Sequence, residues 1–155
     1  ILGELVGWAA GVDRGKKGPG LARVIRNALA SAGIQPTDVD HVNAHGLGTT
    51  AGDAFEARGV GDVFGTDVPV FAPLSRFGNL GAASGLLELA CSVLALQHGV
   101  LPPTRNHTTL APRCPITVHA GDPRPVAEPF AVKVSYTDLG QCAAVVVRGW
   151  EAGQV

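Results

Sequence analysis

Residues 75–98 read SRFGNLGAASGLLELACSVLALQH, and this stretch decides the fold. From Leu80 to His98 the residues are apolar on nearly every side of a helix, and Glu88 is the only acid among them. The apolar stretch is about long enough to span a membrane. In that arrangement the acid would lie near the middle of the bilayer, where a charge is costly. We therefore predict a helix that is buried on all sides inside a layered α/β protein.

The segments on both sides of this helix alternate between helix-like and strand-like patterns. Apolar residues recur at three- and four-residue spacing after Pro19, and Gly33 stands where the helix should end. The other predicted elements are strands at 4–10, 39–44, 68–72, 116–119, 131–136 and 143–149, and a helix at 53–64. This order favours one α/β domain, residues 1–155, with a mixed sheet.

Composition limits the classes of partner. The 155 residues can bury one core, and the net charge is −1 with no run of like charge, which disfavours nucleic acid and anionic membranes. Three cysteines without C-x-x-C spacing, and histidines without metal-ligand spacing, predict no disulfide framework and no metal site, in a reducing cytoplasm. The N-terminus lacks the features of a signal peptide and begins inside a strand-like pattern, which suggests a chain cut or split from a larger one.

The first candidate site is the loop at residues 43–50 (NAHGLGTT), which follows a predicted strand. Ligands collect at such strand ends in α/β sheets. His45 in this loop has small neighbours that allow a substrate to approach, and histidine suits proton transfer near neutral pH. A structural histidine at the end of a strand is the alternative interpretation.

The second candidate site is the turn at residues 75–85, which leads into the apolar helix. Free N–H groups at a helix start favour an anion or a developing oxyanion. Gly78, Gly81 and Gly85 also admit a phosphate- or nucleotide-binding loop, although the G-x-G-x-x-G and Walker patterns are both absent. Close packing of the helix is a third reason for small residues at these positions.

Taken together, the two loops resemble the C-terminal half of β-ketoacyl-ACP synthases. The shared pattern comprises AHGLGT at 44–49, the acids Asp53 and Glu56, and the turn GNLGAASG at 78–85. The flanking residues 31–40 and 94–104 agree as well, so the resemblance covers nearly the whole chain. It implies an α/β thiolase-like layered sandwich, here its C-terminal half, with a mixed sheet and a buried central helix. The nucleophilic cysteine would belong to an N-terminal half that this chain does not contain.

The resemblance also implies roles for single residues. His45 matches the first of the family's two catalytic histidines. Asn79 falls on the second, as in the Cys-His-Asn sets of initiating ketosynthases and chalcone-synthase-like enzymes. Thr49 matches a threonine that binds phosphopantetheine, and Gly78 belongs to the substrate-binding turn. Gly140 is the one residue retained from the family's Gly-Phe-Gly-Gly loop.

Several positions depart from the family pattern. Leu74 stands where the family has a lysine that pairs with the acid matching Glu56. We hypothesise that Arg76, two residues later, pairs with Glu56 instead. Leu47 replaces a second threonine, and Asp138 stands at the position of the loop's phenylalanine, which leaves the substrate class open.

The resemblance implies a decarboxylative Claisen condensation of acyl and malonyl thioesters in fatty-acid or polyketide biosynthesis. The chain would act as an acyltransferase only with its N-terminal half, within a homodimer or heterodimer. Its substrates would be carried by the phosphopantetheine of acyl carrier protein, or by CoA, with no bound cofactor. The alternative is a non-catalytic subunit, resembling a chain-length factor or pseudo-ketosynthase, that shapes a partner's acyl tunnel. Leu74 and the Asp138 loop favour this alternative, whereas His45 together with Asn79 weakens it.

Overall fold

A mixed sheet organises the chain in the computed structural model, which describes residues 1–112 and 114–150. The strand order is β1-β8-β7-β2-β3-β5. The strands are β1 (Gly3–Val12), β2 (Val39–Asn43), β3 (Pro69–Phe71), β5 (Thr117–Val118), β7 (Phe130–Tyr136) and β8 (Gln141–Gly149). β1, β8 and β7 pair antiparallel, whereas β7, β2, β3 and β5 are parallel neighbours. The sheet is mixed, as the sequence predicts.

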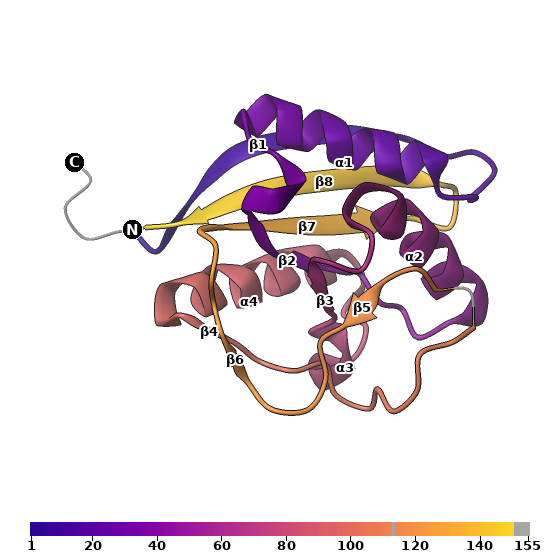
Figure 1. Cartoon of the computed structure of the whole chain (residues 1–155). Coiled ribbons are helices and arrows are strands. Elements are labelled where there is room, and N and C mark those ends of the chain that lie inside the picture. Colours follow the sequence, from indigo (N-terminus) through magenta and orange to yellow (C-terminus); the bar gives the residue numbers. More distant parts are fainter. Residues whose placement is uncertain (113, 151–155) are drawn as a thin grey trace.

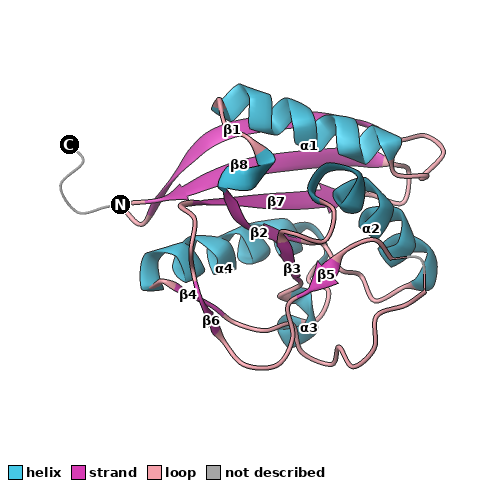
Figure 2. Cartoon of the chain, in the orientation of Figure 1, coloured by secondary structure: helices cyan, strands magenta, loops and turns pink. Residues whose placement is uncertain are grey.

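Helices cover both faces of the sheet (Figures 1 and 2). The helices are α1 (Pro19–Ala32), α2 (Thr50–Phe64), α3 (Leu74–Phe77) and α4 (Ser84–His98), with short 3₁₀ turns at Pro36–Asp38 and Gly81–Ala83. Gly7 of β1 lies against the backbone of α1, where a Cβ atom would have no room. On the other face Gly3 and Gly149 lie against Val93 and Leu96 of α4. The result is a layered α/β structure.

Side chains of β7 alternate between these two layers, as the period of a strand requires. Val132, Val134 and Tyr136 belong to the main hydrophobic core, which α1 and α2 share with the sheet. Ser135 lies beside Gly85 of α4, and Lys133 forms an ion pair with Glu88 of the same helix. The α4 side of β7 is therefore polar.

The expectation that the apolar helix is buried on all sides is not met within this chain. The buried side chains of α4 are Ser84, Glu88, Ser92 and Ala95, so its sheet-facing stripe is largely polar. Leu86 is 74% exposed and Leu94 is 45% exposed on the outward side. The polar residues of α4 face inward because their hydrogen-bond and ion-pair partners lie on the sheet, and the apolar residues face outward.

Other differences are local. Helix α2 begins at Thr50 rather than at residue 53, because Thr49 caps it: the Thr49 Oγ1 accepts a hydrogen bond from the Gly52 amide at 3.2 Å. Helix α3 and the ribbon of β4 (Val100–Leu101) with β6 (Arg124–Pro125) were not predicted. Among the described residues, every helix is too short or too polar to cross a bilayer.

Candidate functional site

The loop that carries His45 follows β2, whose five residues are all buried. Two glycines give the loop its path, with φ values of 53° at Gly46 and 72° at Gly48. Residues other than glycine rarely adopt this left-handed region. A Cβ atom at Gly46 would also lie 2.8 Å from the Cβ of Ala72. The glycines on both sides of Leu47 are therefore required by geometry.

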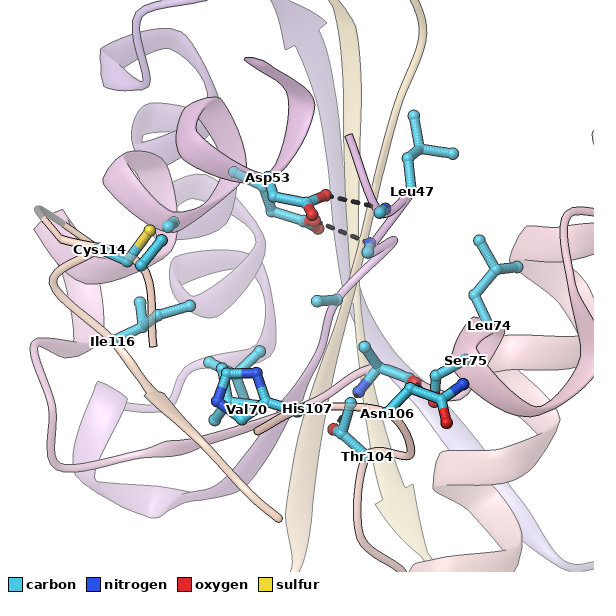
Figure 3. A pocket seen from close by; sticks show the side chains of 18 of the residues that line it. Leu47, Asp53, Val70, Leu74, Ser75, Thr104, Asn106, His107, Cys114 and Ile116 are labelled. Carbon is cyan, nitrogen blue, oxygen red and sulfur yellow. Dashed lines mark hydrogen bonds between the residues drawn. The ribbon is translucent and has the colours of Figure 1, made fainter. Parts of the chain in front are cut away.

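Two carboxylates of α2 hold this loop. The buried side chain of Glu56 accepts hydrogen bonds from the His45 amide at 2.6 Å and the Gly46 amide at 2.9 Å. Burial raises the pKa of the Glu56 carboxyl, although these hydrogen bonds and the charge of Lys133 oppose the rise. Asp53 accepts a hydrogen bond from the Gly48 amide at 3.1 Å, and Figure 3 shows the Asp53 side chain next to the backbone of the loop at Leu47. The loop backbone is thus fixed before any ligand arrives.

The imidazole of His45 faces a buried acid of α4. Its Nδ1 lies 3.4 Å from the carboxylate of Glu88, and its ring packs edge-on against Tyr136 at a centroid distance of 5.3 Å. The side chain is 13% exposed, so part of the ring remains accessible. A proton on Nδ1 satisfies the carboxylate, which leaves Nε2 as the nitrogen that can take up or donate a proton.

Lys133 completes the cluster from β7. Its ammonium lies 2.6 Å from the Glu88 carboxylate, and both side chains are almost fully buried. Burial alone would raise the pKa of the Glu88 carboxyl, but the hydrogen bond from His45 and the charge of Lys133 hold it below its ordinary value. Burial lowers the pKa of the Lys133 ammonium despite the neighbouring carboxylates. His45 therefore stands over a buried ion pair.

The hypothesis that Arg76 pairs with Glu56 is wrong in this structure. The Arg76 guanidinium instead donates to the Pro103 carbonyl at 3.0 Å, near the surface. The charge that acts on the Glu56 carboxyl is that of Lys133. Helix α3 turns the Arg76 side chain toward the 102–105 segment, which the sequence pattern did not predict as a neighbour.

Asn79 follows α3 and is oriented by its own loop. Its Oδ1 accepts hydrogen bonds from the Gly81 amide at 2.8 Å and the Ser84 hydroxyl at 3.3 Å. These contacts orient the amide oxygen inward and leave Nδ2 as a free donor among the described residues. Ser84 also accepts from the Leu80 amide at 2.9 Å, so N–H groups that a phosphate would need are already used. This occupancy disfavours the phosphate-binding interpretation.

A cavity of about 480 Å³ brings the two loops together. Its lining residues include Gly46, Leu47 and Glu56 from the His45 loop and α2, and Leu74, Gly78 and Asn79 from α3 and the turn after it. Figure 3 shows Leu74 and Ser75 across the cavity from Cys114 and Ile116, with Thr104, Asn106 and His107 along a third side. Its size lies in the ordinary range for small-ligand sites.

The remaining predicted positions have structural roles that the sequence did not reveal. The exposed Thr49 caps α2. Gly140 has φ 83° in the turn between β7 and β8, and its carbonyl accepts from the Asp13 amide at 2.8 Å. Cys142 lies two residues after Gly140 and is not one of the predicted site residues. It is buried, its thiol donates to the Gly140 carbonyl, and burial raises the pKa of the thiol, which disfavours a nucleophilic thiolate.

A buried polar chain supports the site from below. The Nδ1 of His41 lies 2.8 Å from Asp40, and its Nε2 lies 2.9 Å from the Ser92 hydroxyl. The Asn43 amide reaches both Ser92 and the backbone carbonyl of Glu88. Ser92 is fully buried, so this Asp-His-Ser order is not a nucleophilic triad. It ties β2 to α4 directly beneath Glu88.

Sequence reasoning missed the roles of Glu88 and Lys133. Glu88 was noted only as the lone acid of an apolar helix, and Lys133 was not singled out. The signal was present, because Lys133 is the one charged residue in the strand FAVKVSY. A charge between buried valines needs a buried partner. Within the described residues no cluster of three or more His, Cys, Asp and Glu side chains is arranged to hold a metal ion.

Comparison with known proteins gives a consistent result. Residues 4–108 match the family model described as the C-terminal domain of β-ketoacyl synthase. The 3-oxoacyl-(acyl-carrier-protein) synthase 2 of Mycobacterium tuberculosis is 40% identical over 122 residues, covering 78% of this chain and 29% of that protein.

Two solved structures share the fold over 97% of this chain, each with a TM-score of 0.89. One is the ishigamide ketosynthase/chain length factor, at 29% identity. The other is a type II polyketide synthase acyl-carrier protein in complex with its ketosynthase bound to the hexaketide, at 27% identity. The present chain spans 39% of each of these matched chains, and thus well under half of their length.

Proposed function

Because this chain belongs to the family of β-ketoacyl synthase C-terminal domains, we propose that it supplies a catalytic histidine, His45, for a decarboxylative Claisen condensation. In this reaction a malonyl thioester loses CO₂, and the enolate left behind attacks the carbonyl of an acyl thioester. A carbon–carbon bond forms, the acyl group's thiolate leaves, and a β-ketoacyl thioester of fatty-acid or polyketide synthesis results. The observation that carries the proposal is His45, fixed over Glu88 beside the cavity that Asn79 lines.

Both side chains are oriented for this chemistry. With Nδ1 of His45 turned to Glu88, its Nε2 is the position that exchanges a proton or donates to a thioester oxygen. With Oδ1 of Asn79 held by Gly81, its Nδ2 is a second donor for the negative charge that develops on the enolate oxygen. Preorganised donors of this kind are worth about 100-fold to 1,000-fold each in rate.

The substrates arrive on a carrier rather than on a bound cofactor. We assign the phosphopantetheine arm of acyl carrier protein, or CoA, to the cavity that Gly78 lines, and we propose the hydroxyl of Thr49, next to the lining residue Gly48, as a further contact. The complex of a related ketosynthase with its acyl-carrier protein supports this choice of partner. A substrate contact of Gly140 stays a prediction, because its packing against Asp13 already accounts for a glycine there.

An N-terminal half is the partner that completes the site. The outward side of α4 exposes Leu86 and Leu94, and the β1 strand exposes Trp8 at 69%. A face this apolar is typical of an interface. We propose that it packs against the half that carries the nucleophilic cysteine, within a dimer. We propose a cytoplasmic location, because three cysteines without C-x-x-C spacing fit a reducing compartment.

Release of CO₂ from malonyl-carrier protein tests this function in the complex of this chain with its N-terminal half. We expect His45→Ala to lower the rate by about 100-fold or more, and Asn79→Ala by a similar factor. His98→Ala, an exposed histidine at the end of α4, is the matched control and should leave the rate unchanged. Equal rates for His45→Ala and the parent would instead support a non-catalytic, tunnel-shaping subunit.

A further inference from the structure

Three buried ionisable side chains from three different elements meet beneath the His45 loop. Glu56 of α2 is 4% exposed, Glu88 of α4 is 1% exposed, and Lys133 of β7 is 4% exposed. Glu56 holds the backbone of His45, and Glu88 holds its ring. Lys133 lies 2.6 Å from Glu88, and its charge also acts on Glu56. The positive charge of Lys133 therefore acts on both of the acids that position His45.

The charge balance around His45 depends on this lysine. The titratable groups around His45 come from three elements: Glu88 of α4, Glu56 of α2, and Lys133 and Tyr136 of β7. Asp53 of α2 and Asp138 of the β7–β8 turn act on Tyr136. Lys133 is the only positively charged side chain in this set. Without it, the carboxylate of Glu88 would have the His45 ring as its nearest source of positive charge.

Stability alone gives no reason for such a cluster. A buried ion pair is frequently no more stable than apolar residues of the same volume. Ala131, two residues before Lys133 and on the same side of β7, is fully buried, so this side of the strand accepts an apolar residue. An apolar residue at position 133 would leave no polar group unpaired if position 88 were apolar as well. The lysine is therefore explained by what the acids do for His45.

We propose that Lys133 is a positioning residue for His45: by neutralising Glu88 and Glu56 from β7, it keeps the imidazole uncharged and fixed for proton transfer. This inference rests on the function proposed above. Lys133 does not touch the substrate; it acts through the carboxylates of Glu88 and Glu56. The carboxylate of Glu88 then accepts a hydrogen bond from Nδ1 without drawing a second proton onto the ring.

The cavity offers a second place for the same charge. Leu74 is 7% exposed and lines the cavity together with Glu56. A lysine at position 74 would extend through this space toward the buried acids. Leu74→Lys in a Lys133→Met background therefore moves the cation from the sheet to α3 while the acids stay in place.

The test measures malonyl decarboxylation against pH in the complex of this chain with its N-terminal half. We expect Lys133→Met to lower kcat by about 100-fold with little change in KM, since small displacements of a reacting group have effects of this size. The acidic limb of its kcat–pH profile should move to higher pH by about one unit, because an unneutralised carboxylate favours the imidazolium form. Adding Leu74→Lys to the Lys133→Met chain should return the acidic limb of the kcat–pH profile to the pH of the parent.

Matched variants separate the possible outcomes. Arg26→Met removes an exposed cation that pairs with Asp62 at 3.0 Å, and it should leave the profile unchanged. An unshifted acidic limb in Lys133→Met, with His45→Ala still inactive, overturns the role of Lys133 but not the proposed function. Equal activity of His45→Ala and the parent overturns both.

Folding of the variants is checked by circular dichroism. If Lys133→Met does not fold, the double variant Leu74→Lys, Lys133→Met is the deciding test. A folded double variant whose acidic limb lies at the same pH as in the parent supports the proposal. A folded double variant without that limb overturns the proposal. Failure of both variants to fold would assign Lys133 to stability and also overturn the positioning role.

Discussion

Acidification from about pH 7.5 to about pH 5 should weaken the fold through one buried side chain, His41. This residue is fully buried between Asp40, 2.8 Å from Nδ1, and the Ser92 hydroxyl, 2.9 Å from Nε2. Ser92 already accepts a hydrogen bond from the Asn43 amide at 2.7 Å. A proton on Nε2 would turn the Ser92 hydroxyl away from the ring and leave its hydrogen without a partner. The neutral tautomer is therefore the one that fits.

The sign and size of the effect follow from linkage. Burial lowers the pKa of His41 below its ordinary value of 6.5, although Asp40 opposes this. The folded state therefore binds fewer protons than the unfolded state below about pH 6.5, and stability falls there as pH falls. One proton corresponds to about 1.4 kcal/mol per pH unit, so His41 alone costs up to about 2 kcal/mol by pH 5. The pKa of Asp40 is lowered from 3.8 and lies outside this window.

Urea unfolding at four pH values between about 7.5 and 5 measures this loss. His41→Asn keeps a donor toward Asp40 but leaves Ser92 without its acceptor, so it should cost about 1–3 kcal/mol at pH 7.5. Its stability should then change much less with pH than that of the parent. His98→Asn, on an exposed histidine, is the control and should follow the parent. Parallel pH curves for the parent and His41→Asn would refute the reasoning.

Three further predictions concern separate parts of the molecule. Gly46→Ala should lower the free energy of unfolding by about 2–4 kcal/mol, whereas Gly33→Ala should lower it by about 1 kcal/mol. Both glycines have positive φ, but of the two only Gly46 lacks space for a Cβ atom, and urea unfolding measures the difference. Leu86→Glu with Leu94→Glu should change this chain's stability by less than about 0.5 kcal/mol yet prevent copurification with the N-terminal half. Cys142 should resist iodoacetamide at neutral pH until the chain is unfolded, because its thiol is buried and its pKa is raised; mass spectrometry detects the adduct.

Periodicity and punctuation allowed most of the fold to be predicted. The helix after Pro19 ends at Ala32, and Gly33 has the left-handed conformation expected of its position. The two loops after predicted strands are indeed adjacent in space, since both line one cavity. These features are local in sequence or follow from the rule that ligands collect at strand ends, so a pattern is enough to find them.

Features that depend on side-chain direction were not predictable in the same way. An apolar helix with one acid reads as buried on all sides, yet α4 turns Glu88 and Ser92 inward and Leu86 outward. The inward direction follows from partners on β2 and β7, which are about 45 residues away in sequence. The pairing of Arg76 with Glu56 is predicted only because Arg76 lies two residues after Leu74, the position of the family's lysine. It is wrong because α3 directs the Arg76 side chain to the Pro103 carbonyl.

The position of the buried cation follows the same reasoning one step further. Two elements border the acids beneath His45: α3, which carries Leu74 on the cavity side, and β7, which carries Lys133 on the sheet side. Burying both acids demands a positive charge nearby, but electrostatics does not specify which element delivers it. A leucine at position 74 thus does not by itself argue that the chemistry of His45 is lost. What matters for such a chain is whether any buried cation reaches Glu88. Here the alternation of side chains along β7 directs Lys133 toward α4, where its ammonium pairs with Glu88.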